Sequence, residues 1–281
     1  MNKMRLLSGL LLVTVLCITG LAASAMQSKE LILATTTSTM DTGLLDYLIP
    51  DFEKKTGYQV KTIAVGTGQA LAMGEKGEAD VLLVHAPNSE KPLVEKELVY
   101  NYRLVMHNDF IVVGPSADPA KIRGLKAVDA FKKIAEQAAP FISRGDDSGT
   151  NKKELELWKD AGLQPGGSWY VQSGSGMGQT LLIASEKGGY TLTDRGTYLA
   201  QKKHLTLAIM VEGEKSLLNI YHVMQVNEKK FPKVNSSGAK AFVDYMVSAA
   251  TQKMIGTFGK DEFGQPLFFP DAGKSMADLG K

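Results

Sequence analysis

Four short segments of the sequence combine hydroxyl side chains with glycine, and each is expected to join a β-strand to a helix. They are Ala34–Thr39, Val65–Gly68, Ser143–Thr150 and Ser173–Gly178. The first N–H groups of a helix lack partners within the helix, and the helix dipole is positive at that end, so such junctions attract anions. A plain N-cap explains any one segment alone. Four of them, two from each half of the chain, favour a shared anion-binding site.

Arg144 is the residue in these segments that would supply positive charge to such a site. Its planar guanidinium matches the oxygens of an anion, and Asp146 is placed to hold it in position. The alternative is a surface ion pair, which contributes only about 0–1 kcal/mol. The Ser148-Gly149-Thr150 sequence that follows favours the binding interpretation.

The rest of the chain alternates short β-rich runs with helical periods, which predicts an α/β fold with mainly parallel sheets. The strands are expected near residues 31–34, 58–65, 80–84, 110–113, 141–143, 169–172, 189–192, 207–210 and 219–226. In a parallel sheet the strand-to-helix junctions lie on one edge. We therefore expect the four segments to converge on a single cleft.

The order of these elements predicts two lobes joined by two crossing strands. The first part of the chain holds too few strands for a complete sheet, while amphipathic segments around Phe242 and Phe258 need a surface to cover. Both needs are met if residues 27–112 and 223–281 form the first lobe and residues 113–222 the second. Such a hinge architecture can close on a ligand. One continuous sheet is the alternative that the pattern leaves open.

The N-terminus has the features of a secretory signal peptide. Lys3 and Arg5 precede an apolar run at residues 6–21, and small residues follow up to Ala25. The run of about 16 residues is shorter than the roughly 20 that span a bilayer. We expect cleavage after about Ala25 and a soluble periplasmic protein. Cys17, the single cysteine, would leave with the leader, which excludes disulfides and a cysteine nucleophile.

The charges and histidines of the remaining chain exclude several functions. The formal net charge of +2 falls to about zero without the leader, so we expect no nucleic-acid partner. The four histidines show no metal-ligand spacing and are interpreted as structural or surface residues, with no metal bound directly by the protein. A hydrolase with Ser148 as nucleophile is the enzyme alternative, but no Gly-x-Ser-x-Gly motif is present. We therefore predict that the protein is not an enzyme and needs no cofactor.

Several motifs resemble those of known oxyanion-binding proteins. Residues 144–150 fit Arg-x-Asp-x-Ser-Gly-Thr, which is similar to the anion-binding loop of periplasmic phosphate-binding proteins. Residues 33–39, 190–195 and 221–227 extend a resemblance to the tungstate-binding proteins of TupA-type ABC transporters over essentially the whole mature chain. The resemblance implies a two-lobed type II binding-protein fold without catalysis. It also implies a monomer that passes tungstate to a membrane ABC permease.

The resemblance and the four helix ends together define a set of candidate ligand-binding residues. These are Thr36, Thr37, Ser38, Thr67, Gly68, Arg144, Ser148, Gly149, Thr150, Ser175 and Gly176. Neighbouring residues of a strand point to opposite faces. The motif therefore leaves open which of the consecutive threonines face the cleft.

Tungstate is the first choice of ligand, with molybdate and phosphate as alternatives of the same fold. Near neutral pH phosphate carries a proton that a buried carboxylate can accept, whereas such a carboxylate would repel tungstate or molybdate. In phosphate-binding relatives this carboxylate follows the strand that corresponds to residues 80–84. Here His85-Ala86-Pro87 follows that strand. Asp147 keeps phosphate open as a ligand if its side chain turns inward, and the sequence does not separate tungstate from molybdate.

Overall fold

The computed structural model describes residues 29–279 of the chain, and the predicted signal peptide lies outside them. The strands are β1 (Glu30–Thr36), β2 (Gln59–Val65), β3 (Val81–Val84), β4 (Val99–Pro115), β5 (Phe141–Ser143), β6 (Tyr170–Gln172), β7 (Thr191–Asp194), β8 (Leu207–Val211), β9 (Leu218–Val226) and β10 (Phe269–Pro270). The helices are α1 (Thr37–Asp41), α2 (Leu44–Thr56), α3 (Thr67–Lys76), α4 (Pro87–Glu95), α5 (Ala127–Glu136), α6 (Gly149–Asp160), α7 (Met177–Lys187), α8 (Arg195–Gln201), α9 (Ser236–Val247), α10 (Ala249–Thr257) and α11 (Lys260–Phe263). Within residues 29–279 no helix combines the length and the apolar character that crossing a membrane requires.

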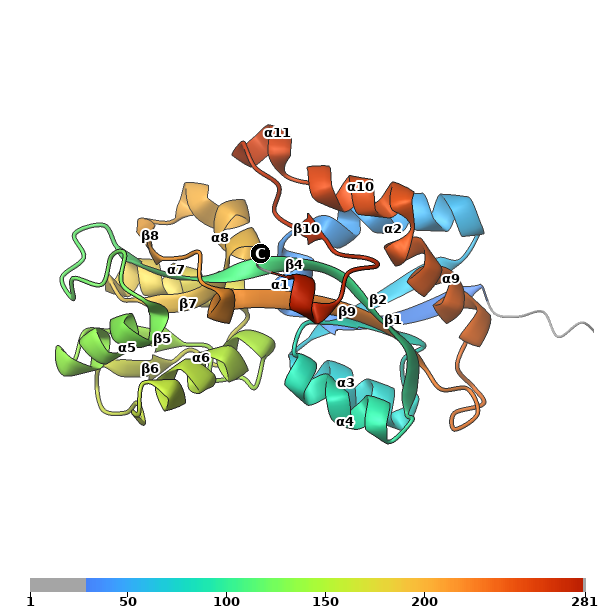
Figure 1. Ribbon diagram of the computed structural model, residues 1–281, viewed down its shortest axis with the longest axis horizontal. Coiled ribbons are helices and arrows are strands. Elements are labelled where there is room, and N and C mark those ends of the chain that lie inside the picture. The colour runs from blue at the N-terminus through green and yellow to red at the C-terminus, as the bar shows by residue number, and fades with distance from the viewer. Residues whose placement is uncertain (1–28, 280–281) are drawn as a thin grey trace, which may run out of the picture.

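The first lobe is built on a sheet with the strand order β10-β4-β9-β3-β1-β2. Its central strand β1 pairs in parallel with β2 and β3, and β3 pairs antiparallel with β9. Helices α2, α9 and α10 lie on one side of this sheet and α3 and α4 on the other (Figure 1). The parallel strands β1, β2 and β3 therefore end at one edge, where α1, α3 and α4 begin.

The second lobe uses the end of β4 together with the strands β5 to β8. β4 pairs antiparallel with β7 and β8, while β5 pairs in parallel with β6. A bridge between Phe141 and Tyr190 connects β5 to the start of β7. Helices α5, α6, α7 and α8 cover these strands (Figure 1).

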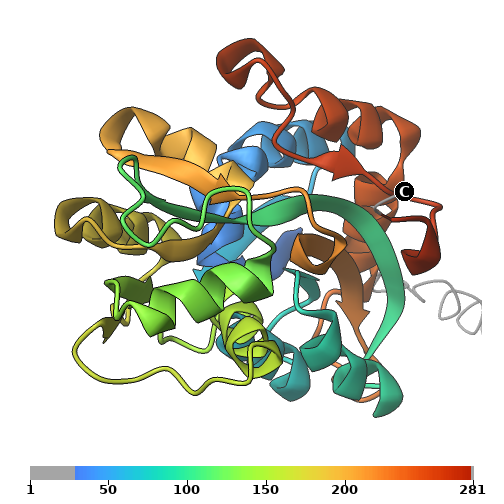
Figure 2. The ribbon, with the colours of Figure 1, turned by 60° about the vertical axis from the view of Figure 1, so that its left-hand side comes forward.

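Two strands cross between the lobes, as the sequence predicts. β4 leaves the first lobe and β9 returns to it, and the two strands lie side by side along the length of the molecule (Figures 1 and 2). β4 changes partners between Asp109, its last residue paired with β9, and Phe110, its first residue paired with β7. This change comes just before the predicted start of the second lobe at residue 113. The exact limits of the lobes stay a prediction.

The expected two-lobed α/β architecture is confirmed, but the expectation of mainly parallel sheets needs correction. Among residues 29–279, every strand pair that involves β4 or β9 is antiparallel, and the parallel strand pairs are β1 with β2, β1 with β3 and β5 with β6. The physical reason is the crossing itself. One strand leaves the first lobe and the other returns, so the two run in opposite directions and impose that direction on their neighbours.

The apolar core extends across both lobes. Its largest cluster includes Phe52 and Phe242 from the first lobe and Met177 and Tyr198 from the second. A second cluster, around Trp158, lies within the second lobe, and a third packs α3 and α4 against the first sheet. Burial of this apolar area is the main stabilising term of the fold. It holds the helix N-termini of the two lobes opposite each other.

Candidate anion-binding site

The structure brings all four predicted segments together between the lobes. The backbone N–H of Gly149, at the start of α6, donates to Thr67 Oγ1 at the start of α3 over 2.8 Å. Arg144 Nη2 donates to Thr37 Oγ1 over 3.4 Å. A Cβ atom on Gly176, the N-cap of α7, would lie 3.7 Å from the same Thr37 oxygen. The N-termini of α1, α3, α6 and α7 thus meet at one place, as the strand-to-helix junctions predict.

Arg144 lies at the centre of this meeting point and is almost fully buried, with 2% of its surface exposed. Its Nη2 atom donates to Asp146 Oδ2 at 2.5 Å, which confirms the predicted role of Asp146 in holding the guanidinium. Its Nε and Nη1 atoms have no hydrogen-bond partner within residues 29–279. Buried N–H groups on a charged side chain are costly when they lack an acceptor. These two groups therefore indicate a position for an anionic ligand.

The loop after Arg144 is shaped so that its donors surround this position. Gly145 and Asp147 adopt positive φ angles of 61° and 58°, which turn the chain sharply before α6. Ser148 is the N-cap of α6, where its Oγ accepts the N–H of Asn151 over 3.2 Å. A hydroxyl that accepts in this way keeps its own proton for another acceptor. Thr150 Oγ1 is buried and has no partner in the described part of the chain, so its donor is also free.

The candidate residues of the first lobe fall into two groups. Thr36 is the N-cap of α1, and its Oγ1 accepts the N–H of Thr39 over 3.2 Å. Ser38 is buried beside it, with 3.2 Å between the two hydroxyl oxygens. Thr37 and Thr67 instead touch the second lobe through Arg144 and Gly149. These contacts give positions for Thr36, Thr37 and Ser38. The motif alone left open which of the consecutive threonines face the cleft.

The remaining candidates border the site in a supporting way. Gly68 packs against the Asp147 carboxylate so closely that a side chain at this position would collide with it. Ser175 bonds to Ser173, because its Oγ donates to the Ser173 carbonyl over 3.1 Å and its N–H donates to Ser173 Oγ over 3.3 Å. Gly176 brings the start of α7 against Thr37. The hydroxyl of Ser175 is therefore occupied by its own loop.

The Asp147 carboxylate lies at the rim of the site, against Gly68, and is largely exposed to solvent. Lys152 Nζ donates to Asp147 Oδ1 over 2.6 Å, and 70% of the Asp147 side chain is exposed. The condition under which the sequence left phosphate open, an inward carboxylate at Asp147, is not met in the structure.

One buried carboxylate near Arg144 was not recognised from the sequence. Asp194 caps α8, where it accepts the N–H of Thr197 and the Thr197 hydroxyl, each over 2.8 Å. Burial raises the pKa of Asp194 to about 6, while Thr197 and the charge of Arg144 partly oppose this shift. Its only signal in the sequence is its place in the Tyr190–Arg195 motif, at the end of a predicted strand.

His85 is also part of the site, although its sequence context gave it a structural or surface role. It follows β3 directly, at the same sheet edge as the other segments. Its Nε2 atom lies 2.9 Å from Thr36 Oγ1 and 3.2 Å from Ser38 Oγ. Burial lowers the pKa of His85 to about 4, so the ring is neutral at pH 7. The available signal was its position after a buried strand, since metal-ligand spacing was not relevant.

Acidification is expected to remove stability that depends on the neutral state of His85. In the unfolded chain its pKa is about 6.5 and in the folded chain about 4. Between these values the unfolded chain binds more protons, so the free energy of unfolding falls as the pH falls. The difference corresponds to about 3 kcal/mol, fully present above pH 6.5 and lost by about pH 4. Urea unfolding across this range should show that His85→Gln removes this component, and identical pH profiles for both proteins would contradict it.

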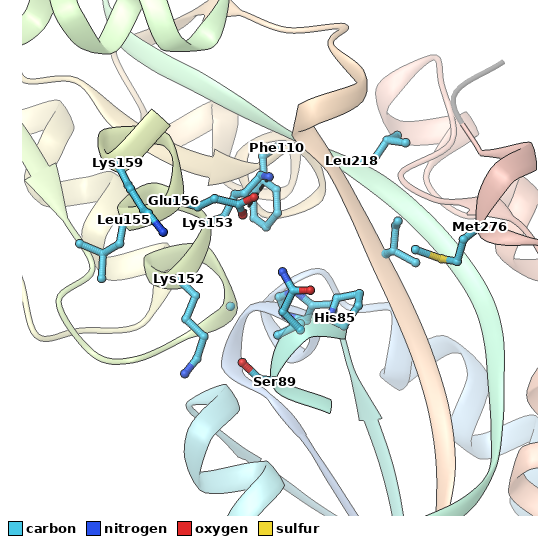
Figure 3. A pocket seen from close by; sticks show the side chains of 15 residues that line it. His85, Ser89, Phe110, Lys152, Lys153, Leu155, Glu156, Lys159, Leu218 and Met276 are labelled. Atoms are coloured by element: carbon cyan, nitrogen blue, oxygen red, sulfur yellow. Dashed lines mark hydrogen bonds and ion pairs between the residues drawn. The ribbon is translucent and has the colours of Figure 1, made fainter. Parts of the chain in front are cut away.

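A pocket of about 550 Å³ lies beside the site, between α6 and residues 85–89. His85 and Gly149 border both the pocket and the site, while Lys152, Lys153 and Lys159 lie along its α6 side (Figure 3). Glu156 pairs with Lys153, and Asp147 pairs with Lys152. The pocket therefore reaches the edge of the site along a wall that carries both signs of charge.

Comparisons with known proteins decide the family. The sequence profile of the PBP superfamily domain matches residues 22–250. The tungstate-binding protein TupA of Peptoclostridium acidaminophilum is 49% identical over 284 aligned residues, which cover 96% of this chain and 99% of that protein. The chain belongs to the TupA family within the PBP superfamily.

Two solved structures support the same assignment for the fold. The tungstate ABC transporter structure from Geobacter sulfurreducens is 48% identical, with a TM-score of 0.75, and covers 82% of this chain and 98% of that one. TupA from Desulfovibrio alaskensis G20 is 47% identical, with a TM-score of 0.73, and covers 86% of this chain and 99% of that one. The predicted TupA resemblance and the periplasmic binding protein fold are confirmed. Members of the TupA family are solute-binding proteins, which confirms that the chain is not an enzyme.

Proposed function

We propose that this chain captures tungstate in the periplasm and delivers it to an ABC permease. The observation that carries the proposal is the Arg144 guanidinium, which is buried between the lobes with two N–H groups that lack acceptors within residues 29–279. An unprotonated dianion supplies the missing acceptors and balances the charge. The names of the relatives from Peptoclostridium acidaminophilum and Desulfovibrio alaskensis support tungstate as this dianion.

We propose that the direct ligands are Arg144, Thr150, Thr37 and Ser38, with the N-terminal ends of α3, α6 and α7 around them. Thr67 and Ser148 accept backbone N–H groups with their oxygens and keep their hydroxyl protons for the anion. Hydrogen bonds to a charged group contribute roughly 1.5–3 kcal/mol each. Six or seven of them, less the costs of closure, reach the roughly 12 kcal/mol of nanomolar binding.

The proposal also covers the export of the protein and the state in which it acts. The signal peptide is proposed to be cleaved after about Ala25, and the mature protein to act as a monomer without cofactor or nucleic acid. N-terminal sequencing of the protein from a periplasmic extract tests the cleavage site. A start at Met1 would contradict export by this route.

Tungstate is expected to stabilise the protein more than any other common oxyanion. Bound ligand at about 1,000 times its Kd adds about 4 kcal/mol to the free energy of unfolding. Thermal unfolding with tungstate, molybdate, sulfate and phosphate, followed by competitive calorimetry, ranks the four anions. Tighter binding of phosphate would contradict the choice of ligand.

A further inference from the structure

His85 connects the proposed anion site to both crossing strands. Its Nδ1 atom lies 2.8 Å from Asn219 Oδ1 on β9. Asn219 Nδ2 in turn donates to Asn108 Oδ1 on β4 over 2.8 Å and to the Tyr221 hydroxyl over 3.1 Å. The imidazole also stacks on the Tyr221 ring, with 4.6 Å between the ring centroids. The ring therefore has a fixed position and fixed partners on both of its nitrogen atoms.

These partners determine which nitrogen of His85 carries the proton. Because Asn219 Nδ2 gives its hydrogens to Asn108 and Tyr221, the amide presents only its oxygen to His85. An oxygen in this position accepts, so His85 Nδ1 must donate. A neutral imidazole has one N–H, and its other nitrogen is then an acceptor. His85 Nε2 therefore offers a lone pair to the hydroxyl groups of the site.

His85 Nε2 can accept a hydrogen bond from the hydroxyl of Thr36 or from that of Ser38. Thr36 Oγ1 is nearer to Nε2, at 2.9 Å against 3.2 Å for Ser38 Oγ. Thr36 Oγ1 also accepts the N–H of Thr39 and lies 2.7 Å from the Thr39 hydroxyl oxygen, a pair in which either group can donate. With Thr39 as the donor, both lone pairs of Thr36 are satisfied and its own proton is left for His85. Each hydroxyl has a single proton to donate. If the Thr36 hydroxyl donates its hydrogen bond to His85, the Ser38 hydroxyl remains free to donate to a ligand.

We propose that His85 is a positioning residue that accepts a hydrogen bond from the Thr36 hydroxyl and leaves the Ser38 hydroxyl free to donate to the ligand. The site thereby selects oxyanions that carry no proton. This inference rests on the proposed function and deepens it. A protonated oxyanion such as hydrogen phosphate needs an acceptor for its own O–H. His85 Nε2 is an acceptor at this edge of the site, and in this arrangement it is already bonded to the Thr36 hydroxyl.

Two carboxylates near Arg144 already accept hydrogen bonds within the protein. Asp146 accepts from Arg144 and from the N–H of Ser148, and Asp194 accepts twice from Thr197. An O–H group on a ligand beside Thr36 and Ser38 would lose its hydrogen bond to water and find His85 Nε2 bonded to Thr36, which is the kind of mismatch that produces discrimination.

The tautomer of His85 is the first test, and it needs no ligand. Long-range ¹H–¹⁵N NMR spectra of the full mature protein, with the His85 signals assigned by their loss in His85→Gln, report which ring nitrogen is protonated. We expect the Nδ1–H tautomer at neutral pH. A protonated Nε2 would overturn the proposal, whatever the protein binds.

Selectivity is the second test, measured as the ratio of the Kd values for phosphate and tungstate. His85→Glu places a charged acceptor with spare lone pairs beside Thr36 and Ser38, so the ratio should fall by about 10-fold or more. His107→Gln is the matched control, since His107 is a partly buried histidine bonded to Asp271 in the first lobe.

The two tests separate this inference from the proposed function. An unchanged ratio in His85→Glu would overturn the role of His85 even if the unaltered protein binds tungstate tightly. Failure of the unaltered protein to bind any oxyanion would overturn the proposed function, while the NMR spectra would still decide the tautomer. If His85→Glu does not fold, the tautomer of His85 in the unaltered protein still decides the proposal.

Discussion

Replacing Arg144 by methionine is expected to weaken tungstate binding by about 2–5 kcal/mol, which is roughly 30-fold to 4000-fold in Kd. Methionine keeps much of the volume of the side chain but removes all of its N–H groups. The loss is large because Arg144 is buried and two of its nitrogens have no other acceptor within residues 29–279. Titration calorimetry with tungstate measures the effect.

Two further variants show whether the shape or only the charge of Arg144 matters. Arg144→Lys retains a positive charge but loses the planar fork, so its affinity should lie between those of the unaltered protein and Arg144→Met. Arg123→Ala is the matched control, because Arg123 is exposed and donates to the Ile209 carbonyl. It should bind tungstate as the unaltered protein does.

Stability without ligand distinguishes a binding role of Arg144 from a structural one. A buried cation with unpaired N–H groups costs free energy in the absence of its anion. Arg144→Met relieves this cost but leaves Asp146 without its cationic partner, so the melting temperature of the ligand-free protein should change much less than the affinity. A large loss of melting temperature with little change in Kd would show that Arg144 holds the fold rather than the ligand.

The sequence predicts the positions of the binding segments well because they depend on local chemistry. Hydroxyl and glycine residues at the ends of strands mark helix N-termini, and the sheet places these ends on a common edge. The contacts of Thr67 with Gly149 and of Thr37 with Arg144 follow from this rule. The pairing of Arg144 with Asp146 was predictable for the same reason, since the two residues are neighbours in one loop.

Features that depend on distant residues could not be predicted in this way. Strand direction is one example, because apolar patterning describes which face of β4 or β9 is buried but not its neighbours. His85 is another, because its role depends on Asn219 and Asn108, which are far from it in the sequence and come from two different strands. Asp194 lies next to the site only because β7 pairs with the end of β4.

Adding a side chain at Gly149 is expected to keep the lobes apart and to weaken tungstate binding. A Cβ atom there would lie 3.0 Å from His85 Cε1 and 3.3 Å from Thr67 Oγ1, which is tighter than ordinary contact. Forcing extra atoms into a packed region typically costs about 1–3 kcal/mol, or roughly 5-fold to 150-fold in Kd. Gly149→Val should show a larger loss than Gly149→Ala when both are titrated with tungstate.

The control and a second variant identify the contact that matters. Gly166 has no atoms near the position of an added Cβ and no positive φ angle, so Gly166→Ala should leave the Kd unchanged. Thr67→Val removes the acceptor for the Gly149 N–H while conserving shape, and should weaken binding by roughly 2-fold to 10-fold. Because the strain at Gly149 arises only where α6 meets α3 and His85, opening of the lobes relieves it, and the ligand-free protein should unfold at nearly its normal temperature. Normal tungstate affinity in Gly149→Val would mean that the anion binds without this contact between the lobes.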